Sequence, residues 1–391
     1  MITILAWMCA VVWIAAVVLV VLNLSLLPRL KQEDSAASFE LPSLAVVIPA
    51  RNEERDIERA VRALVEQDYP TLEVIVVDDQ STDRTREILR SIATESSRLR
   101  VIDGEPPPPG WLGKPWALQQ GGTAAESRLL LFCDADVDYV PGALRTVASA
   151  FVERKLGGMS LLPRMEMQGF WEHVLMVQLP FTAFSLLPLF LSNSVQLPGL
   201  GVGGGPGNLL YKDTWQRIGT HERLRSAVVD DVALMQLIRH EGGCTGVVIA
   251  NDLVSVRMYR GFFEIVRGFS KNSFHATGGT VPKAAGALAI MVLFNVVPFL
   301  LLTLALVSVA NGAPLGMHHW LGITAFGALV CARLILFRGL RYRLDNAVLG
   351  HPLMTVVWLW VLVSSLWKVG VRRRLVWRGR DYDARTARFG K

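Results

Sequence analysis

The sequence has little cysteine and little charge. Only four of its 391 residues are cysteine, and no two of them have the spacing of a metal or redox motif: Cys9, Cys133, Cys244 and Cys331. This argues against a disulfide framework or a cysteine-held zinc site. Charged residues make up 19% of the chain, against about 25% in an ordinary soluble domain, while 51% are hydrophobic. The balance excludes a disordered chain and indicates a membrane protein.

Two long stretches lack charge altogether. The first charged side chain is Arg29, and no Asp, Glu, Lys or Arg occurs between Lys283 and Arg333. The first stretch also lacks the basic start of a cleaved signal peptide, which is the competing interpretation. We therefore predict a transmembrane anchor over residues 1–28, with the following Arg29 and Lys31 on the cytoplasmic side.

The C-terminal part, residues 284–369, is predicted to hold about three membrane segments. They lie at about 285–310, 319–337 and 347–366, with aromatic residues suited to the interface. Residues 170–192 are also nearly uncharged but are broken by prolines. We predict interfacial helices there, and a buried helix of a globular domain is the alternative.

The net charge of +6 is concentrated in a basic tail, residues 370–391. From Lys368 to Lys391 there are nine basic and two acidic residues, so the rest of the chain is close to neutral. A nucleic-acid partner is therefore not expected. One anchor followed by three spans would put this tail outside the cell, against the positive-inside rule. We expect 347–366 to be re-entrant or interfacial, with the tail on anionic lipid headgroups.

Between the apolar blocks, residues 43–280 are predicted to form a cytoplasmic globular domain. The continuous apolar run at 44–49 is typical of a buried parallel strand, and a second strand is predicted at 73–77. Each is followed by an amphipathic helix, at 56–67 and 85–94. This alternation predicts an open α/β sheet.

Polar side chains follow the predicted strands. Arg51–Glu54 follow the first, Asp78–Asp83 follow the second, and Asp134-Ala-Asp136 follows an apolar strand at 129–133. Ligands of open α/β sheets bind at the carboxyl ends of the strands. Two carboxylates leaving a buried strand are costly unless a cation meets them, and carboxylate oxygens suit Mg²⁺ or Mn²⁺ bridging a diphosphate. An acidic surface turn is the competing interpretation.

The order of these motifs resembles that of the family 2 glycosyltransferases with the GT-A fold, a Rossmann-like mixed α/β sheet. The matching stretches are Pro49–Glu53, Val77–Asp83, Gly113–Leu118, Asp134–Asp136, Gly219–Glu222 and Val229–Leu234. With its membrane segments, the chain resembles the membrane-bound bacterial branch that glycosylates lipids, such as the hopanoid-associated and carotenoid (diaponeurosporenoate) glycosyltransferases. Further similar stretches are Met258–Phe262, Gly268–Asn272 and Trp377–Arg380.

On the donor side, the resemblance implies that residues after the first two strands bind the nucleotide of a UDP- or GDP-sugar. Asp79 is implied to contact the base, with Asp78 as a further candidate, and Lys114 lies near the diphosphate. The full set implied for the donor is Ala50, Arg51, Glu53, Asp78, Asp79, Lys114 and Asp134.

On the reacting side, the resemblance implies that Asp134 touches ribose or metal and that Asp136 holds the metal, Mg²⁺ or Mn²⁺. Asp231 takes the place of the catalytic base. The family usually has Glu-Asp where this chain has Asp230-Asp231, so Asp230 is a second candidate. An inverting transfer needs such a carboxylate opposite the leaving diphosphate. An ordinary acid at a helix N-terminus is the alternative for Asp231.

The sequence departs from the processive members of the family, because their Gln-x-x-Arg-Trp motif is not found. Arg267 and Lys271 lie in roughly that region, either as phosphate-side residues or as basic residues at a membrane interface. The glycine-rich stretch Gly199–Gly207 lacks the strand and helix of a dinucleotide loop. We predict a mobile acceptor-side loop whose glycines permit close approach or gating.

Together these features predict a multi-pass enzyme of the plasma membrane. It would move a sugar, with inversion, to a hydroxyl or carboxyl group of a membrane lipid such as a hopanoid or carotenoid. The alternatives are a polysaccharide or polyprenyl-phosphate glycosyltransferase and a catalytically silent membrane scaffold. Buried acids without a ligand would destabilise a scaffold, and a transporter would need internal repeats that we do not find.

Overall fold

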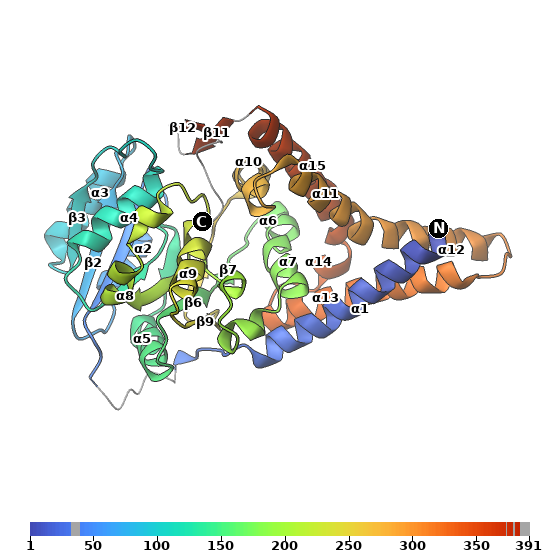
Figure 1. Cartoon of the computed structure of the whole chain (residues 1–391), viewed down its shortest axis with the longest axis horizontal. Coiled ribbons are helices and arrows are strands. Elements are labelled where there is room, and N and C mark those ends of the chain that lie inside the picture. The colour runs from blue at the N-terminus through green and yellow to red at the C-terminus, as the bar shows by residue number, and fades with distance from the viewer. Residues whose placement is uncertain (33–39, 373, 378–379, 384–391) are drawn as a thin grey trace. The chain divides into compact units, whose positions relative to one another are not determined.

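The computed structural model describes residues 1–32, 40–372, 374–377 and 380–383. Contacts divide the chain into two units, which are described separately (Figure 1). The sheet unit consists mainly of Leu27–Glu166 and Leu191–Met258, and the helical unit of Met1–Leu26, Met167–Phe190 and Tyr259–Leu375. Residues 170–190 and 259–280 therefore pack with the apolar helices.

The sheet unit is built on seven strands in the order β3-β2-β1-β4-β8-β6-β9. The strands are β1 (Leu44–Ala50), β2 (Leu72–Asp78), β3 (Leu99–Asp103), β4 (Leu129–Phe132), β6 (Gly158–Leu162), β8 (Asn208–Tyr211) and β9 (Thr245–Ile249). The first four run parallel, whereas β8 runs antiparallel between β4 and β6. The predicted mixed α/β sheet is confirmed. Because β1, β2 and β4 are parallel, the polar segments that follow them meet at one edge.

Helices connect the strands of this unit. They are α2 (Ile57–Val65), α3 (Thr85–Glu95), α4 (Gly113–Ala124), α5 (Ala143–Glu153), α8 (Lys212–Arg217) and α9 (Asp230–His240), with short 3₁₀ turns η3 (Pro198–Leu200) and η4 (His221–Leu224). A second, three-stranded sheet has the order β5-β10-β7, formed by β5 (Val137–Tyr139), β10 (Val254–Val256) and β7 (Arg164–Met165).

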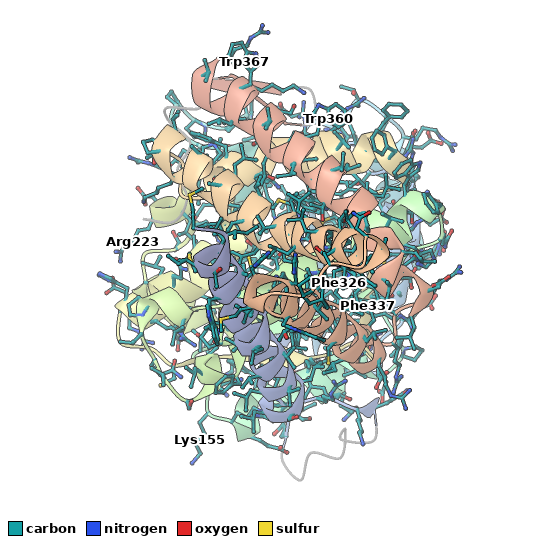
Figure 2. The ribbon with its side chains drawn as sticks, turned by 90° about the vertical axis from the view of Figure 1, so that its right-hand side faces the viewer. Lys155, Arg223, Phe326, Phe337, Trp360 and Trp367 are labelled. Atoms are coloured by element: carbon teal, nitrogen blue, oxygen red, sulfur yellow. The ribbon has the colours of Figure 1, made fainter. Side chains whose placement is uncertain are left out.

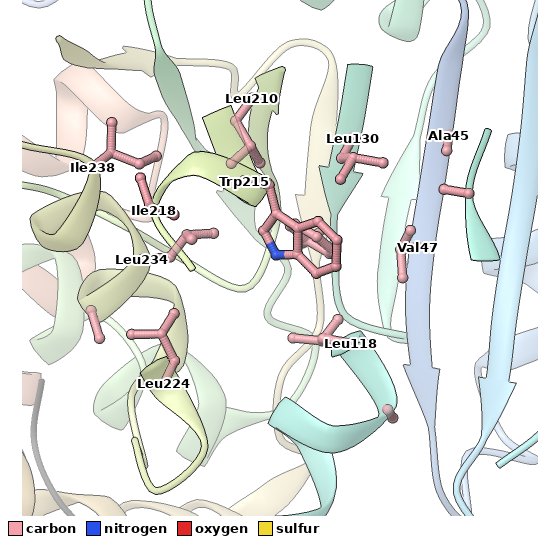
Figure 3. Packing of buried hydrophobic residues seen from close by; sticks show 14 of the residues in the cluster. Ala45, Val47, Leu118, Leu130, Leu210, Trp215, Ile218, Leu224, Leu234 and Ile238 are labelled. Atoms are coloured by element: carbon pink, nitrogen blue, oxygen red, sulfur yellow. The ribbon is translucent and has the colours of Figure 1, made fainter. Parts of the chain in front are cut away.

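A buried apolar cluster joins the middle of the sheet to α4, α8 and α9 (Figure 3). Trp215 of α8 is 2% exposed, and its ring lies 6.1 Å from the ring of Phe132 at the end of β4. Leu118 of α4 and Leu234 of α9 belong to the same cluster. This packing fixes the first turns of α4 and α9 beside the end of β4, where the polar motifs lie.

The helical unit contains four apolar helices that are long enough to cross a membrane: Ile2–Leu26, Val281–Ala310, Met317–Leu340 and Gly350–Val371. They correspond to α1 (Ile2–Leu26), α11 (Val281–Asn295) with α12 (Val297–Ala310), α13 (Met317–Leu340), and α15 (Gly350–Ser365) with the π-helical turn η5 (Leu366–Val371). Helices α1, α12 and α13 run side by side in Figures 1 and 2. The four overlap the predicted anchor and segments.

Proline breaks the second of these spans. Pro298 lacks the N–H that would bond to the carbonyl of Phe294 four residues earlier. The indole of Trp13 on α1 donates to that Phe294 oxygen instead, at 2.7 Å. A buried carbonyl without a partner is expensive, above all in a membrane. The substitute donor explains how the break at Val296 is tolerated.

Smaller helices complete the helical unit: α6 (Phe170–Leu175), α7 (Gln178–Leu186), α10 (Gly261–Ala276) and α14 (Asp345–Val348). Asn23 of α1 is fully buried and donates to the carbonyls of Phe184 and Leu187, at 2.9 and 2.8 Å. Arg333 is buried in α13 and lies over the rings of Phe181 and Phe337. Figure 2 labels Phe337 on this helix.

Near the C-terminus, β11 (Arg374–Trp377) pairs with β12 (Arg380–Asp383). Residues 378–379 of the predicted Trp377–Arg380 motif, and Arg373 and 384–391 of the basic tail, lie outside the described residues. Since α15 with η5 is long enough to cross a membrane, the re-entrant placement of 347–366 and the side of the tail stay predictions.

Candidate active site

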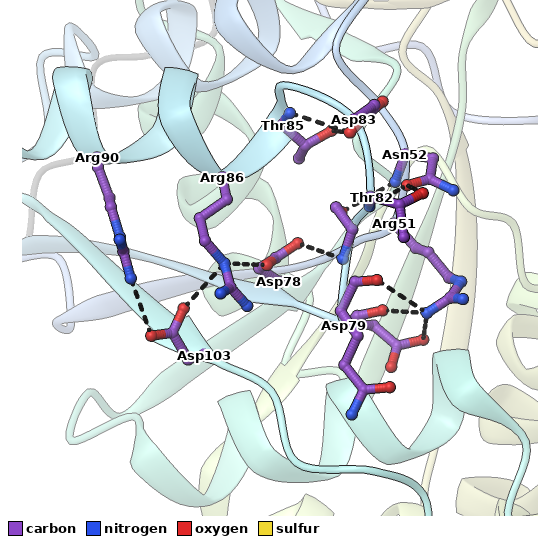
Figure 4. Close-up of polar contacts among 12 residues, drawn as sticks. Arg51, Asn52, Asp78, Asp79, Thr82, Asp83, Thr85, Arg86, Arg90 and Asp103 are labelled. Atoms are coloured by element: carbon purple, nitrogen blue, oxygen red, sulfur yellow. Dashed lines mark hydrogen bonds and ion pairs between the residues drawn. The ribbon is translucent and has the colours of Figure 1, made fainter.

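The segments after β1 and β2 are joined to each other by hydrogen bonds (Figure 4). The Thr82 amide donates to the Asn52 side chain at 2.8 Å, and the Glu53 amide donates to the Thr85 hydroxyl at 2.8 Å. Asn52 and Gln80 both have positive φ, at 54° and 58°. A left-handed Gln is uncommon, and such backbone strain tends to occur at functional sites.

Arg51 holds the backbone after β2. Its guanidinium donates to the carbonyls of Asp79 and Gln80 and lies 4.0 Å from the Asp79 carboxylate (Figure 4). Asp79 itself is 2% exposed. The predicted nucleotide residues Arg51 and Asp79 are therefore in contact with each other, across loops that leave neighbouring strands.

Asp78 has both carboxylate oxygens engaged within the protein. Its Oδ1 accepts the Ser81 amide at 3.1 Å, and its Oδ2 accepts Nε of Arg86 at 2.8 Å. Arg86 also lies 3.3 Å from Asp103 (Figure 4). These bonds suit Asp78 to holding the shape of the loop, so that base contact would fall to its neighbour Asp79.

Three acids and one lysine converge beside the end of β4. Lys114 in the first turn of α4 has its Nζ 2.7 Å from Oδ1 of Asp134 and 3.5 Å from Oδ1 of Asp230. Asp230 and Asp231 occupy the first turn of α9, where the helix dipole favours negative charge. Three carboxylates around one ammonium give this site a formal charge of −2.

Burial and mutual charge govern ionisation at this site. Burial alone lowers the pKa of Lys114, but the charges of Asp134, Asp230 and Asp231 outweigh it and raise the pKa well above its usual 10.5. Burial raises the pKa of Asp230 to about 7, against the opposing effect of Lys114. Burial also raises the pKa of Asp231 above its usual value. A raised carboxylate pKa makes a stronger base.

The pKa of Asp230 predicts a pH-dependent stability. Because it rises from 3.8 to about 7 on folding, the folded state binds this proton more tightly. The contribution of this proton to the free energy of unfolding is therefore full below pH 3.8 and is lost as the pH rises through about 7. Melting temperatures of wild type and Asp230→Asn, measured from about pH 4 to about pH 8, should diverge in this window.

The exposed Asp213 provides a control for this measurement, because it is also an acid in the first turn of a helix, α8. Asp213→Asn should not reproduce the divergence near pH 7 that Asp230→Asn shows. A pH-independent difference between wild type and Asp230→Asn would contradict the raised pKa.

A small cavity is lined by the charged residues and by Leu118, Phe132, Cys133, Gly205 and Asn208. His221 packs edge-on against Phe132, with ring centroids 4.6 Å apart, and its Nδ1 accepts the indole N–H of Trp215 at 2.9 Å. Burial, with a further effect of Lys114, lowers the pKa of His221 to about 3. His221 is thus a neutral, buried residue that packs behind Phe132 of the cavity lining.

No three His, Cys, Asp or Glu side chains among the described residues converge on a common metal position. This suits a metal that is shared with a substrate, because Mg²⁺ typically takes one or two carboxylates plus phosphate oxygens. Asp134 offers such a carboxylate, 36% exposed. Its charge and oxygen donors fit Mg²⁺ or Mn²⁺ bound together with a diphosphate.

Comparison with known proteins agrees with this arrangement. The family model described as Glycosyl transferase family 2 matches residues 45–197, which include β1, β2, β4 and Asp134. The chain thus contains a family 2 glycosyltransferase domain, whose model covers residues 45–197. The predicted resemblance to this family is confirmed.

Relatives extend the similarity over most of the chain. The 4,4'-diaponeurosporenoate glycosyltransferase of Staphylococcus aureus strain N315 is 26% identical over 392 residues, covering 95% of this chain and 98% of the relative. The protein of the same name from strain bovine RF122 is 27% identical over 356 residues, covering 88% and 90%.

The fold is also found among solved structures. It is the mannosyltransferase PcManGT from Pyrobaculum calidifontis in complex with GDP-Man and Mn²⁺, with a TM-score of 0.55 and 17% identity. The match covers 94% of this chain and 98% of that one. The predicted GT-A fold of the glycosyltransferase domain is thereby confirmed.

All the predicted site residues except Asp136 fall into three groups. Lys114, Asp134, Asp230 and Asp231 line one cavity of the sheet unit. Ala50, Arg51, Glu53, Asp78 and Asp79 lie at the ends of β1 and β2. Arg267 and Lys271 lie on α10 of the helical unit, and Asp136 follows Asp134 by two residues without lining the cavity. The functional roles of all of them stay predictions.

Two residues of the sheet unit were not among the predicted site residues, although Gly205 lies in the predicted loop Gly199–Gly207. Gly205 lines the cavity, and its carbonyl accepts the Asp134 amide at 2.9 Å. Arg239 of α9 is 4% exposed and is surrounded by oxygen acceptors of a segment more than forty residues earlier. For Gly205 the only available signal was the glycine spacing. For Arg239 it was an arginine inside an apolar helix face.

Proposed function

We propose that this glycosyltransferase moves a sugar, with inversion, from a nucleotide-sugar donor to a carotenoid-type lipid acceptor in the membrane. The observation that carries the proposal is the cluster of Lys114, Asp134, Asp230 and Asp231 at the ends of the parallel strands. The names of the 26–27% identical relatives support the acceptor class. The fold neighbour was solved with a nucleotide sugar and Mn²⁺, which supports the donor class.

In this mechanism the acceptor oxygen attacks the anomeric carbon of the sugar while the bond from that carbon to the diphosphate oxygen breaks. The nucleoside diphosphate leaves on the opposite face, which inverts the configuration. Asp231 accepts the proton of a hydroxyl acceptor, and its raised pKa strengthens it as a base. Lys114 is placed to exchange its carboxylate partners for the diphosphate, whose negative charge grows as the bond breaks.

A bound Mg²⁺ or Mn²⁺, held by Asp134 and, as the resemblance implies, Asp136, would neutralise charge on the leaving diphosphate. Asp79 and Arg51, with the backbone after β1, would bind the nucleotide. The helical unit would lie in the membrane that holds the lipid acceptor, because four of its helices are long enough to cross a bilayer. A cytoplasmic catalytic unit in a multi-pass plasma-membrane protein is part of this proposal, as is the contact of the basic tail with anionic lipids.

The test is to incubate membranes containing the chain with a panel of labelled UDP- and GDP-sugars and to extract the lipids. We expect label in a low-mass lipid with one donor. Label in an insoluble polymer or in a polyprenyl phosphate would favour the alternative glycosyltransferase activities. Intact nucleotide binding with no labelled product from any donor would favour the silent scaffold.

Chelation gives a separate prediction. EDTA should abolish transfer, and Mg²⁺ or Mn²⁺ added in excess should restore it, because Asp134 and the diphosphate would share the ion. The measurement is the initial rate before and after each addition. Full activity after EDTA treatment and gel filtration into metal-free buffer would show that transfer needs no divalent metal.

A further inference from the structure

Residues Gly201–Gly207, named here the glycine strap, run along α9 and then across Asp134. A Cβ added at Gly201 would lie 2.8 Å from the backbone N of Gln236 in α9. A Cβ added at Gly203 would lie 2.6 Å from the backbone N of Val232, and closer still to the Asp231 carbonyl. The strap backbone thus rests directly on the first turn of the helix that carries Asp230 and Asp231.

The strap then reaches the other acid of the site. A Cβ added at Gly205 would lie 2.8 Å from Cγ of Asp134 and closer still to its Oδ2. A Cβ added at Gly207 would lie 2.7 Å from the Tyr139 hydroxyl. Alternate glycines therefore face, in turn, α9, Asp231, Asp134 and the second sheet.

These four alternate positions need glycine because there is no room for a side chain, and not because of their backbone conformation. The strap is described throughout, and none of its glycines has the positive φ that other residues avoid. Each could be alanine as far as φ is concerned. An alanine at Gly201 or Gly203 would meet backbone of α9, one at Gly205 would meet the Asp134 carboxylate, and one at Gly207 would meet the Tyr139 hydroxyl.

Hydrogen bonds hold the segment before the strap to the far end of α9. Arg239 donates to the carbonyls of Val195 and Leu197, each at 3.1 Å, and to the Ser192 hydroxyl at 2.9 Å. Bonds to charged donors are among the strong ones. This end of the segment therefore cannot retreat from α9 without breaking several of them.

The other end of the strap is held as well. The Tyr139 hydroxyl donates to the Pro206 carbonyl at 2.6 Å, and the side-chain amide of Asn208 donates to the Gly204 carbonyl at 3.2 Å. The Asp134 amide donates to Gly205. With both ends fixed, a side chain added to the strap must displace what the strap touches.

We propose that the glycine strap is a positioning element that sets where the Asp134 carboxylate and the Asp231 end of α9 stand relative to each other. Gly203 would position Asp231, the proposed base. Gly205 would position Asp134, the acid proposed to hold the metal. The sequence predicts that glycines in this loop permit close approach, and the proposal depends on that approach. For its kinetic consequences it rests on the sugar transfer proposed above.

The test compares Gly203→Ala and Gly205→Ala with Gly199→Ala, a matched control whose added Cβ would meet nothing within 4 Å. Gly203→Ala should lower kcat by about a hundredfold with little change in the donor KM, as expected for an ångström-scale displacement of a reacting group. Gly205→Ala should weaken Mn²⁺ binding, followed by electron paramagnetic resonance in the presence of nucleoside diphosphate, by about tenfold or more. Gly199→Ala should match wild type in both.

Melting temperatures separate positioning from misfolding. Gly205→Ala should melt like the control, because its Cβ meets only a side chain that can rotate, so its loss of Mn²⁺ binding is informative even if Gly203→Ala folds poorly. Mn²⁺ binding and kcat like those of Gly199→Ala would overturn the proposal. If wild type transfers no sugar from any donor, the proposed function fails, while the Mn²⁺ comparison still decides the role of the strap.

Discussion

Replacing Asp231 by Asn should lower kcat for transfer to a hydroxyl acceptor by about two to four orders of magnitude, the usual contribution of a general base. The variant keeps the shape of the side chain and removes its ability to accept a proton. Donor binding should change little, because the proposed role of Asp231 is to accept the acceptor's proton and not to bind the nucleotide. Single-turnover rates and equilibrium binding of the nucleotide sugar measure the two effects.

Asp213→Asn is the matched control, since Asp213 is an exposed acid in the first turn of α8. It tests the interpretation that Asp231 merely complements a helix dipole, which would be worth about 0.3–1 kcal/mol. Unchanged turnover in Asp231→Asn would refute its role as the base. A loss shared equally by both variants would point to helix stability instead.

The loss of kcat in Asp231→Asn should depend on the acceptor. A carboxylic acid acceptor, as the relatives' name indicates for them, is already ionised near neutral pH and needs no base. Asp231→Asn should then cost far less with a polyene carboxylate than with a polyene alcohol. An equal loss with both acceptors would mean that Asp231 acts on orientation and not on the proton.

Replacing Lys114 by Met should destabilise the glycosyltransferase domain by about 3 kcal/mol near neutral pH, because it leaves Asp134, Asp230 and Asp231 without their buried counter-charge. The measurement is the melting temperature of the purified chain at two pH values. The loss should be smaller at acidic pH, where Asp230, with its pKa of about 7, is protonated. Donor affinity should fall as well, because Lys114 is proposed to meet the diphosphate.

Added Mn²⁺ distinguishes this explanation from a packing defect. The site carries a formal charge of −3 without the lysine, so Mn²⁺ should stabilise Lys114→Met more than wild type. Lys155→Met, which removes an exposed lysine far along the chain from the site, should leave both stability and Mn²⁺ response unchanged. A pH-independent loss that Mn²⁺ does not relieve would contradict the charge argument.

The sequence predicts the strands of the sheet well because their signal is local. The apolar runs 44–49 and 73–77 become β1 (Leu44–Ala50) and β2 (Leu72–Asp78), one residue different at most at each end. The polar motifs follow because parallel strands bring their carboxyl ends to one edge. The meeting of Lys114 with Asp134 and Asp230 depends in addition on the packing of α4 and α9 against the sheet, which brings their first turns beside the end of β4.

Contacts between distant segments could not be predicted in this way. The Trp13 indole that bonds to the carbonyl left free by Pro298 lies 281 residues from Phe294. The alternate glycines of the strap do not reveal their neighbours, because those include α9, which follows the strap by more than twenty residues. Arg239 could be recognised as an anchor only once its carbonyl partners had been placed around it.

The most direct test of the account is transfer by the purified chain, reconstituted in lipid vesicles with one labelled nucleotide sugar and a defined polyene carboxylate or alcohol. The account predicts a lipid-soluble product whose mass equals acceptor plus one sugar, with inverted configuration and release of one nucleoside diphosphate. Asp134→Ala should form little of it. Hydrolysis of the donor to free sugar, with no glycosylated acceptor from any donor of the panel, would contradict it.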